Sequence, residues 1–338
     1  MKILVENSTW NNVGDGWYQY SLYFLLKKLY PDSKVIMGEG PIKRSFRIRS
    51  EKQLSNALNL LEWQDADLHV FSGPMLKSLI ADYGTKIKKI VESGKQYAFI
   101  SVSGANEAST KQTLEDAKDF LKKYPPVFFS SRDSFTYNIF KDAVPNAYDG
   151  ICTAFLVDLT LELDTFKMDK PFFVSSFYME NEPDFNVDGS NALTVENLEV
   201  KHRKNKWGLP FKYARHLNYT LPQQAEVGGH QIVRLIQNLN TKFNHINFAM
   251  PNSFMSFNPI TYLEVIKSAE FVVSDRVHAC ATSLACNKPA RFLFDTPRAV
   301  IFDRLGFDYK SNKGIMYPNM DKIAEEKLKL EDKIKQYI

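Results

Sequence analysis

The stretch from Phe271 to Phe294 constrains the fold of this chain more than any other. Residues 271–274 are mostly apolar and β-branched, and they predict a short buried strand. The alanine-rich segment 277–286 predicts a closely packed helix, which an Asn-Lys-Pro sequence at 287–289 ends. Residues 290–294 resume as a strand. Strand, turn, helix and strand in this order predict a parallel α/β crossover.

Four polar residues, Ser274, Asp275, Arg276 and His278, gather where this strand ends and the helix begins. Open α/β sheets bind ligands at such junctions, and a helix N-terminus attracts anions. An arginine adds a planar fork that fits phosphate or carboxylate, and a histidine can deliver a proton. The pattern therefore predicts an anionic small molecule bound by Arg276, with His278 at its edge. The alternative is an ion pair of Arg276 with Asp275 or another carboxylate, with His278 capping the helix.

The length of the chain indicates how many domains it forms, and its composition argues against several classes of function. The 338 residues suit two domains. A net charge of +4 is too small to indicate nucleic acid, but it fits anionic small substrates. The three cysteines form no zinc pattern and predict a reducing compartment without disulfides. The N-terminus reads as a strand rather than a signal peptide, and no apolar run approaches the roughly 18 residues of a membrane span, so we expect a cytoplasmic protein.

Polar residues also follow the first predicted strand. Asn12, Gly14 and Asp15 lie between a strand at 2–6 and a helix at 17–30, which is a ligand-facing position in a Rossmann-like domain. Gly14 would let the backbone approach a ligand, and Asp15 would accept a proton from a sugar hydroxyl. The alternative is that Asp15 only caps the helix. Neither a glycine-rich dinucleotide motif nor a P-loop motif occurs, which argues against those sites.

Two further arginines follow predicted strands. Arg132 comes directly after a strand at 127–130 and is a candidate second anion contact, or else a partner of Asp133 in the turn. Arg298 follows the strand at 290–294, close enough in sequence to reach the same anion as Arg276. Both positions fit the rule that ligands bind at the carboxyl ends of parallel strands.

Five strand–helix alternations in the first half predict a doubly wound α/β domain. We place the link between two domains in the charged, proline-terminated segment 157–171, which gives domains of 1–160 and 161–338. In the second domain, apolar residues at helical spacing predict a helix over 229–240. The charged helix predicted over 321–338 is expected to cross back over the first domain.

The most basic stretch, 201–216, mixes cations with aromatic residues. We expect it to contact a lipid-linked or nucleotide-linked sugar diphosphate, or the inner face of the membrane. The alternative is a solvated basic loop. Nothing else in this part of the chain points to a particular acceptor.

Several of these motifs resemble the polysaccharide pyruvyl transferase family. They are Ser-Asp-Arg-Val-His-Ala at 274–279 with its alanine-rich helix and Lys-Pro turn, Asn-Val-Gly-Asp at 12–15, and Arg-Asp at 132–133. Ser-Gly-Pro at 72–74 departs from the glycine run usual there. The resemblance implies two Rossmann-like domains facing across a cleft, as in B-type glycosyltransferases. It also implies phosphoenolpyruvate as donor and a saccharide of cell-surface or exopolysaccharide biosynthesis as acceptor, with no cofactor and no metal.

On this basis we expect His278 to be the general acid and Asp15 to serve the acceptor, with Arg276, Arg132 and Arg298 binding the donor. A bound dianion would raise the pKa of His278 and keep it charged. The remaining predicted binding residues are Asn12, Gly14 and Ser274. Two alternatives stay open: a B-type glycosyltransferase that uses a nucleotide sugar, and a non-catalytic sugar-binding homologue.

Overall fold

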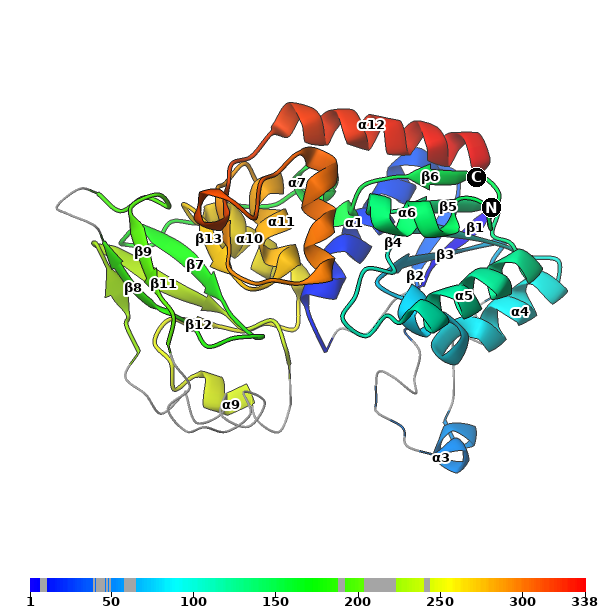
Figure 1. Cartoon of the computed structure of the whole chain (residues 1–338), viewed down its shortest axis with the longest axis horizontal. Coiled ribbons are helices and arrows are strands. Elements are labelled where there is room, and N and C mark those ends of the chain that lie inside the picture. The colour runs from blue at the N-terminus through cyan, green and yellow to red at the C-terminus, as the bar shows by residue number, and fades with distance from the viewer. Residues whose placement is uncertain are drawn as a thin grey trace.

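Figure 1 shows two α/β units side by side in a computed structural model, with helices packed between their sheets. The structure describes residues 1–6, 11–38, 40, 46, 48, 50–57, 65–187, 192–203, 223–239 and 244–338.

The N-terminal unit is built on six parallel strands in the order β2-β1-β3-β4-β5-β6. Buried residues, most of them apolar, run almost without a break along the inner strands, because helices cover both faces of such a sheet. This is a doubly wound, Rossmann-like order. The strands are β1 (Lys2–Val5), β2 (Lys34–Met37), β3 (Leu68–Gly73), β4 (Gln96–Val102), β5 (Phe128–Ser131) and β6 (Ala147–Asp149).

Helices connect these strands and end with recognisable caps. Thr110 forms a reciprocal capping box with Thr113 at the start of α5, and Asp133 accepts from the Thr136 N–H at the start of α6. The helices of this unit are α1 (Gly14–Leu29), α3 (Glu51–Ser55), α4 (Thr85–Glu92), α5 (Lys111–Lys123) and α6 (Ser134–Phe140), with short turns η2 (Leu76–Ser78) and η3 (Ile80–Gly84) before α4.

The C-terminal unit has a second sheet whose four central strands, β11-β7-β13-β14, are parallel. The edge strands β10 and β15 run antiparallel to their neighbours, and β12 pairs with the end of β11. The strands are β7 (Phe172–Ser176), β10 (Glu226–Val227), β11 (His230–Leu235), β12 (Ser253–Phe254), β13 (Val272–Ser274), β14 (Ala290–Phe292) and β15 (Ile315–Met316), beside a separate hairpin of β8 (Asp184–Val187) and β9 (Leu198–Lys201).

Helical segments surround the second sheet and join it to the first unit. Strand β6 ends at Asp149 and β7 begins at Phe172, so the change of sheet falls around the predicted link at 157–171. The segments are η4 (Thr153–Leu156), α7 (Val157–Thr160), α9 (Asn244–Asn247), α10 (Pro259–Ser268), α11 (Val277–Ala285), η5 (Pro297–Leu305), η6 (Asn312–Gly314) and α12 (Met320–Tyr337).

The helix predicted over 229–240 is wrong, because His230–Leu235 is strand β11, which lies between β10 and β7 in the sheet. Ile232 and Leu235 do follow helical spacing, but Val233 and Arg234 between them are equally buried. A central parallel strand buries both of its faces, and a short apolar run in such a strand mimics the pattern of a buried helix.

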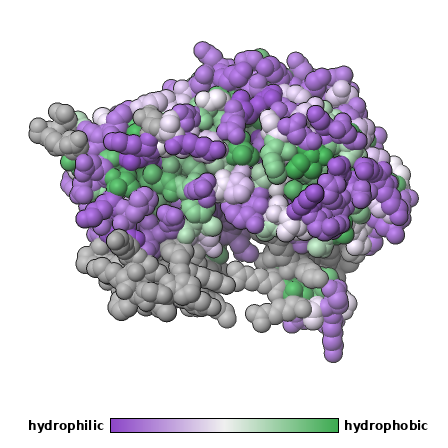
Figure 2. Space-filling model, in the orientation of Figure 1, coloured by the Kyte–Doolittle hydropathy of each residue, from purple (hydrophilic) through white to green (hydrophobic). Residues whose placement is uncertain are grey.

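The last helix, α12, packs across the N-terminal unit and lies along the top of Figure 1. Tyr337 stacks on Phe128 with ring centroids 5.5 Å apart, and Ile323, Leu330 and Ile334 join a core shared by both units. The outer face of α12 is rich in Lys and Glu, and the top of the molecule in Figure 2 is accordingly mostly hydrophilic. Among the described residues, no helix has the length and apolarity needed to cross a bilayer.

Candidate functional site

A cleft of about 570 Å³ lies between the two units. Its N-terminal wall follows strands β1, β3 and β4 and includes Asn12, Asp15 and Glu107. Its C-terminal wall follows β7, β11, β13 and β14 and includes Arg276 and Arg298. The carboxyl ends of both parallel sheets therefore face the same space, which is the expected ligand position in such folds.

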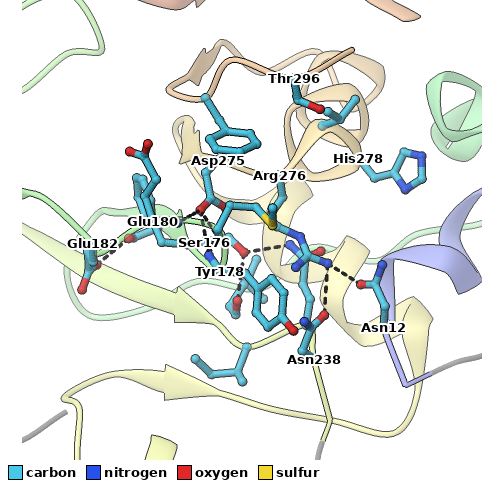
Figure 3. A pocket seen from close by; sticks show the side chains of 18 of the residues that line it. Asn12, Ser176, Tyr178, Glu180, Glu182, Asn238, Asp275, Arg276, His278 and Thr296 are labelled. Atoms are coloured by element: carbon cyan, nitrogen blue, oxygen red, sulfur yellow. Dashed lines mark hydrogen bonds between the residues drawn. The ribbon is translucent and has the colours of Figure 1, made fainter. Parts of the chain in front are cut away.

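Arg276 lies at the centre of the C-terminal wall. Its Nη2 donates to Asn12 Oδ1 at 2.6 Å and to Asn238 Oδ1 at 3.1 Å, as Figure 3 shows. Its guanidinium carbon lies 4.9 Å from the ring centroid of Tyr178, a cation–π contact. These neutral partners hold the guanidinium group in place and leave its positive charge uncompensated by any carboxylate ion pair among the described residues.

Asp275 does not form the alternative ion pair with Arg276. Its buried carboxylate instead accepts the backbone N–H groups of Tyr178, Met179 and Glu180, at 2.6–3.0 Å. Burial raises the pKa of Asp275, and the charge of Arg276 and these hydrogen bonds oppose the rise. Asp275 thus fixes the loop after β7, which carries the Tyr178 ring beneath Arg276 (Figure 3).

Replacing Asp275 with asparagine is expected to destabilise the protein by about 1–3 kcal/mol, because the amide has one oxygen in place of two and cannot accept all the N–H groups of the 178–180 loop. Urea unfolding followed by circular dichroism measures this change. The control is Asp119→Asn on α5, a side chain 74% exposed, which should shift the free energy of unfolding by less than about 0.5 kcal/mol. Equal shifts in the two variants would contradict the assigned role of Asp275.

His278 is the second residue of α11. It lines the cleft, although only 3% of its surface is exposed. The N-cap of α11 is Arg276, so the alternative of His278 as the helix cap is wrong. The Nη1 group of Arg132 donates to His278 Nε2 at 3.2 Å, and the Tyr18 ring meets the imidazole edge-on at 5.1 Å. Residues of the N-terminal unit thus orient a histidine of the C-terminal unit.

Burial, followed by the positive charges of Arg132, Arg298 and Arg276, holds the pKa of His278 well below its ordinary value of 6.5. A hydrogen bond to the Gly14 backbone opposes this lowering. An imidazole that accepts from an arginine at Nε2 is neutral. Without a bound anion His278 is therefore uncharged, and a negative ligand must supply the field that protonates it.

This lowered pKa predicts that stability falls as the pH falls through about 6.5, because below that value the unfolded chain binds a proton that the folded protein excludes. The slope for one such group approaches about 1.4 kcal/mol per pH unit. Urea unfolding at about pH 7.5 and about pH 5.5 should show a smaller loss in His278→Gln than in the wild type. The same loss in both proteins would contradict a neutral, buried His278.

Arg132→Met isolates the contribution of the arginine. Removing the guanidinium group and its hydrogen bond to Nε2 is expected to raise the pKa of His278 toward its ordinary value. NMR titration of the imidazole signals measures this, with His278→Gln identifying the signal. An unchanged titration would show that the Arg132 contact does not control the charge of His278.

Arg298 and Asp15 lie near Arg276 on opposite walls. Burial, followed by the charge of Arg132, lowers the pKa of Arg298, while Asp15 and Glu107 act in the opposite direction. The Nε atom of Arg298 is buried and has no hydrogen-bond partner among the described residues. Asp15 is only 7% exposed and lies within the first turn of α1, whose N-cap is Val13, so it does not cap that helix.

Three predicted binding residues do not line the cleft. Ser274 is fully buried; its hydroxyl donates to the Ser176 carbonyl oxygen and accepts from the Arg276 N–H, so it shapes the turn instead of touching a ligand. The missing side chain of Gly14 leaves space for Gln237, because a Cβ at Gly14 would lie 2.9 Å from Gln237 Oε1. Arg132 is 1% exposed behind His278 and forms no ion pair with Asp133, which caps α6.

The sequence interpretation missed several residues of the cleft. Asn238 follows β11, and was hidden by the helix predicted there. Tyr178, Glu107 and Thr296 each follow a strand by a few residues, and a consistent use of the strand-end rule would have found them. The predicted contact segment 201–216 lies outside the described residues except for 201–203. No cluster of three metal-ligating side chains occurs in the part of the chain that the structure describes.

Comparison with solved structures places this architecture in a known class. The chain matches UDP-N-acetylglucosamine 2-epimerase from Neisseria meningitidis bound to UDP-GlcNAc, with a TM-score of 0.50, 11% identity and coverage of 99% of this chain and 100% of the other. A protein from Listeria monocytogenes assigned as the same enzyme matches with a TM-score of 0.52 and 10% identity, over 100% of this chain and 89% of the other. S. aureus MnaA with UDP matches with a TM-score of 0.50 and 11% identity, over 99% of this chain and 89% of the other. At these identities the likeness shows the fold alone, which confirms two Rossmann-like domains facing across a cleft.

The family follows from the sequence profile. The model of the polysaccharide pyruvyl transferase family matches residues 12–293, most of the chain, whereas no curated protein sequence matches it. The protein therefore belongs to the polysaccharide pyruvyl transferase family, which confirms the resemblance and makes it a member of a transferase family. The match includes residues of both walls of the cleft, among them Asn12, Arg276 and His278, and it ends before Thr296 and Arg298.

Proposed function

We propose that this protein transfers a pyruvyl group from phosphoenolpyruvate to two hydroxyls of a sugar and forms a cyclic ketal in the cleft. One observation carries the proposal. Arg276 and Arg298 line the cleft beside His278, and neither guanidinium group has a carboxylate ion pair among the described residues. Two such groups match the carboxylate and the phosphate of a three-carbon donor.

The chemistry begins with protonation of the methylene carbon of the bound donor. The central carbon then becomes an oxocarbenium-like electrophile, a sugar hydroxyl adds to it, phosphate leaves, and a second hydroxyl closes the ring. His278 supplies the first proton from Nε2, which gives up its hydrogen bond from Arg132 when the bound dianion offsets the arginine charges that lower the pKa of the imidazole. Arg276 and Arg298 stabilise the departing phosphate, and Arg132 orients the imidazole until Nε2 is protonated, when this hydrogen bond breaks.

The acceptor occupies the N-terminal wall, where Asp15 takes a proton from the attacking hydroxyl. A saccharide on a nucleotide or lipid carrier fits this role. The epimerase from Neisseria meningitidis that shares the fold binds UDP-GlcNAc, which supports a nucleotide-linked sugar as the first acceptor to test. The reaction needs no cofactor besides the donor. We place the reaction in the cytoplasm.

The test is incubation with phosphoenolpyruvate and a panel of UDP-N-acetylglucosamine, UDP-galactose and p-nitrophenyl galactoside. Phosphate release and a new ketal methyl signal in NMR are expected in the wild type and absent in Arg276→Ala. Failure to release phosphate with the whole panel would contradict the proposal. Sugar transfer without phosphoenolpyruvate would indicate a B-type glycosyltransferase, and thermal stabilisation by these ligands without turnover would indicate a sugar-binding homologue.

A further inference from the structure

Formation of a cyclic ketal removes protons from two hydroxyls. Phosphoenolpyruvate as a trianion and a diol give a ketal monoanion and hydrogen phosphate, so two O–H bonds break, one C–H bond forms at the methyl group, and one proton leaves on phosphate. The proposed function assigns Asp15 to one hydroxyl. The second hydroxyl must lose its proton when it captures the oxocarbenium carbon, and this step calls for another base.

Glu107 lies on the same wall as Asp15, in the loop after β4, and its exposed side chain lines the cleft. One carboxylate oxygen accepts from the hydroxyl of Thr296, which belongs to the opposite unit. The other oxygen, Oε2, accepts no hydrogen bond from the described residues. Glu107 is thus held across the cleft by one oxygen and offers the second to the open space.

The same contact connects Glu107 to the donor side. Thr296 Oγ1 also accepts the Arg298 N–H at 3.2 Å, so the carboxylate of Glu107 and the backbone of Arg298 share one hydroxyl. Asp15 and Glu107 both act electrostatically on the Arg298 side chain. Two carboxylates of the acceptor wall therefore lie close enough to act on one arginine of the donor wall.

We infer that Glu107 accepts the proton of the second acceptor hydroxyl, so that Asp15 and Glu107 serve the two hydroxyls of one sugar diol in turn. This inference rests on the proposed function. The second hydroxyl attacks the oxocarbenium carbon, a C–O bond forms, and its proton passes to Glu107 Oε2 and then to the released phosphate or to water. The cleft therefore selects saccharides whose two free hydroxyls reach both carboxylates.

A specific failure follows if Glu107 cannot accept the proton. After phosphate has left, water competes with the second hydroxyl for the same carbon. Addition of water gives a hemiketal, which collapses to free pyruvate and the unchanged sugar. Loss of this base thus uncouples phosphate release from ketal formation, whereas loss of a purely structural residue lowers both products together.

Glu107→Gln tests the inference, because the amide oxygen still accepts the Thr296 hydroxyl but takes up no proton. Phosphate, pyruvate and ketal are quantified with phosphoenolpyruvate and the acceptor panel. The variant is expected to form ketal about 10²- to 10⁴-fold more slowly and to release mostly free pyruvate per phosphate. One ketal per phosphate at the wild-type rate, or equal loss of ketal and phosphate without pyruvate, would overturn the inference.

Thr296→Val is the matched control, since it removes the bond across the cleft and keeps the carboxylate. This variant is expected to form one ketal per phosphate released, whether or not its turnover rate changes. Release of pyruvate by this variant and not by Glu107→Gln would assign the effect to the hydrogen bond and contradict proton transfer. If the wild type released no phosphate, the proposed function would fail as well, whereas wild-type turnover with unchanged products in Glu107→Gln would refute the role of Glu107 alone.

Discussion

Replacing His278 with glutamine is expected to lower kcat for phosphate release by about 10²- to 10⁴-fold, the usual cost of losing a positioned general acid. Glutamine preserves polar contacts near Arg132 but delivers no proton to a carbon. The dissociation constant for phosphoenolpyruvate should change by less than about threefold, because binding depends on the arginines. Stopped-flow phosphate release measures the rate, and calorimetry measures the affinity.

His245→Gln on α9 is the matched control for this prediction, because His245 is exposed and does not line the cleft. It should retain the wild-type rate. A His278→Gln protein that also kept the wild-type rate would remove the proposed acid. Loss of donor affinity in step with the rate would instead make His278 a binding residue.

Replacing Arg276 with methionine is expected to weaken phosphoenolpyruvate binding by about 10²- to 10³-fold, which corresponds to the loss of one partner of a desolvated charge pair. The side chain is held by Asn12, Asn238 and Tyr178, so the unliganded protein already presents it in a fixed position. The affinity of Arg276→Lys for phosphoenolpyruvate should fall between those of the wild type and Arg276→Met, because lysine keeps the charge and loses the planar fork. Calorimetric titration with phosphoenolpyruvate gives the constants.

Lys122→Met controls for the change in net charge, since Lys122 is an exposed cation on α5, 54% accessible. Its affinity for the donor should equal that of the wild type, as expected for a screened surface charge. Circular dichroism of Arg276→Met checks that the protein folds without the hydrogen bond from Arg276 to Asn12. Unchanged donor affinity in folded Arg276→Met would contradict the assignment of this arginine.

Much of this site could be predicted from local sequence because strand ends in parallel sheets converge. The segment 271–294 carries its strand, turn and helix in one continuous stretch, and it places Arg276 and His278 without knowledge of the rest. The sequence could not show what lies opposite. That Arg132 contacts His278, and that Asn12 and Asn238 hold Arg276, depends on how the two units pack.

The errors have the same physical origin. In β11 the buried run from Ile232 to Leu235 looks helical because both faces of this strand are buried, and only its pairing with β7 distinguishes a strand from a helix. Ser274 was predicted to bind a ligand because it is polar at a strand end, yet its hydroxyl is used within the turn. Local pattern identifies the edge of a sheet, but tertiary packing decides which side chains face the cleft.

A crystal structure with phosphoenolpyruvate bound tests the central claim most directly. The account predicts the phosphate and the carboxylate against the guanidinium groups of Arg276 and Arg298, with the methylene carbon facing the imidazole of His278. It would be contradicted by a donor bound elsewhere while Arg276 stays on Asn12 and Asn238, or by a methylene carbon turned away from His278.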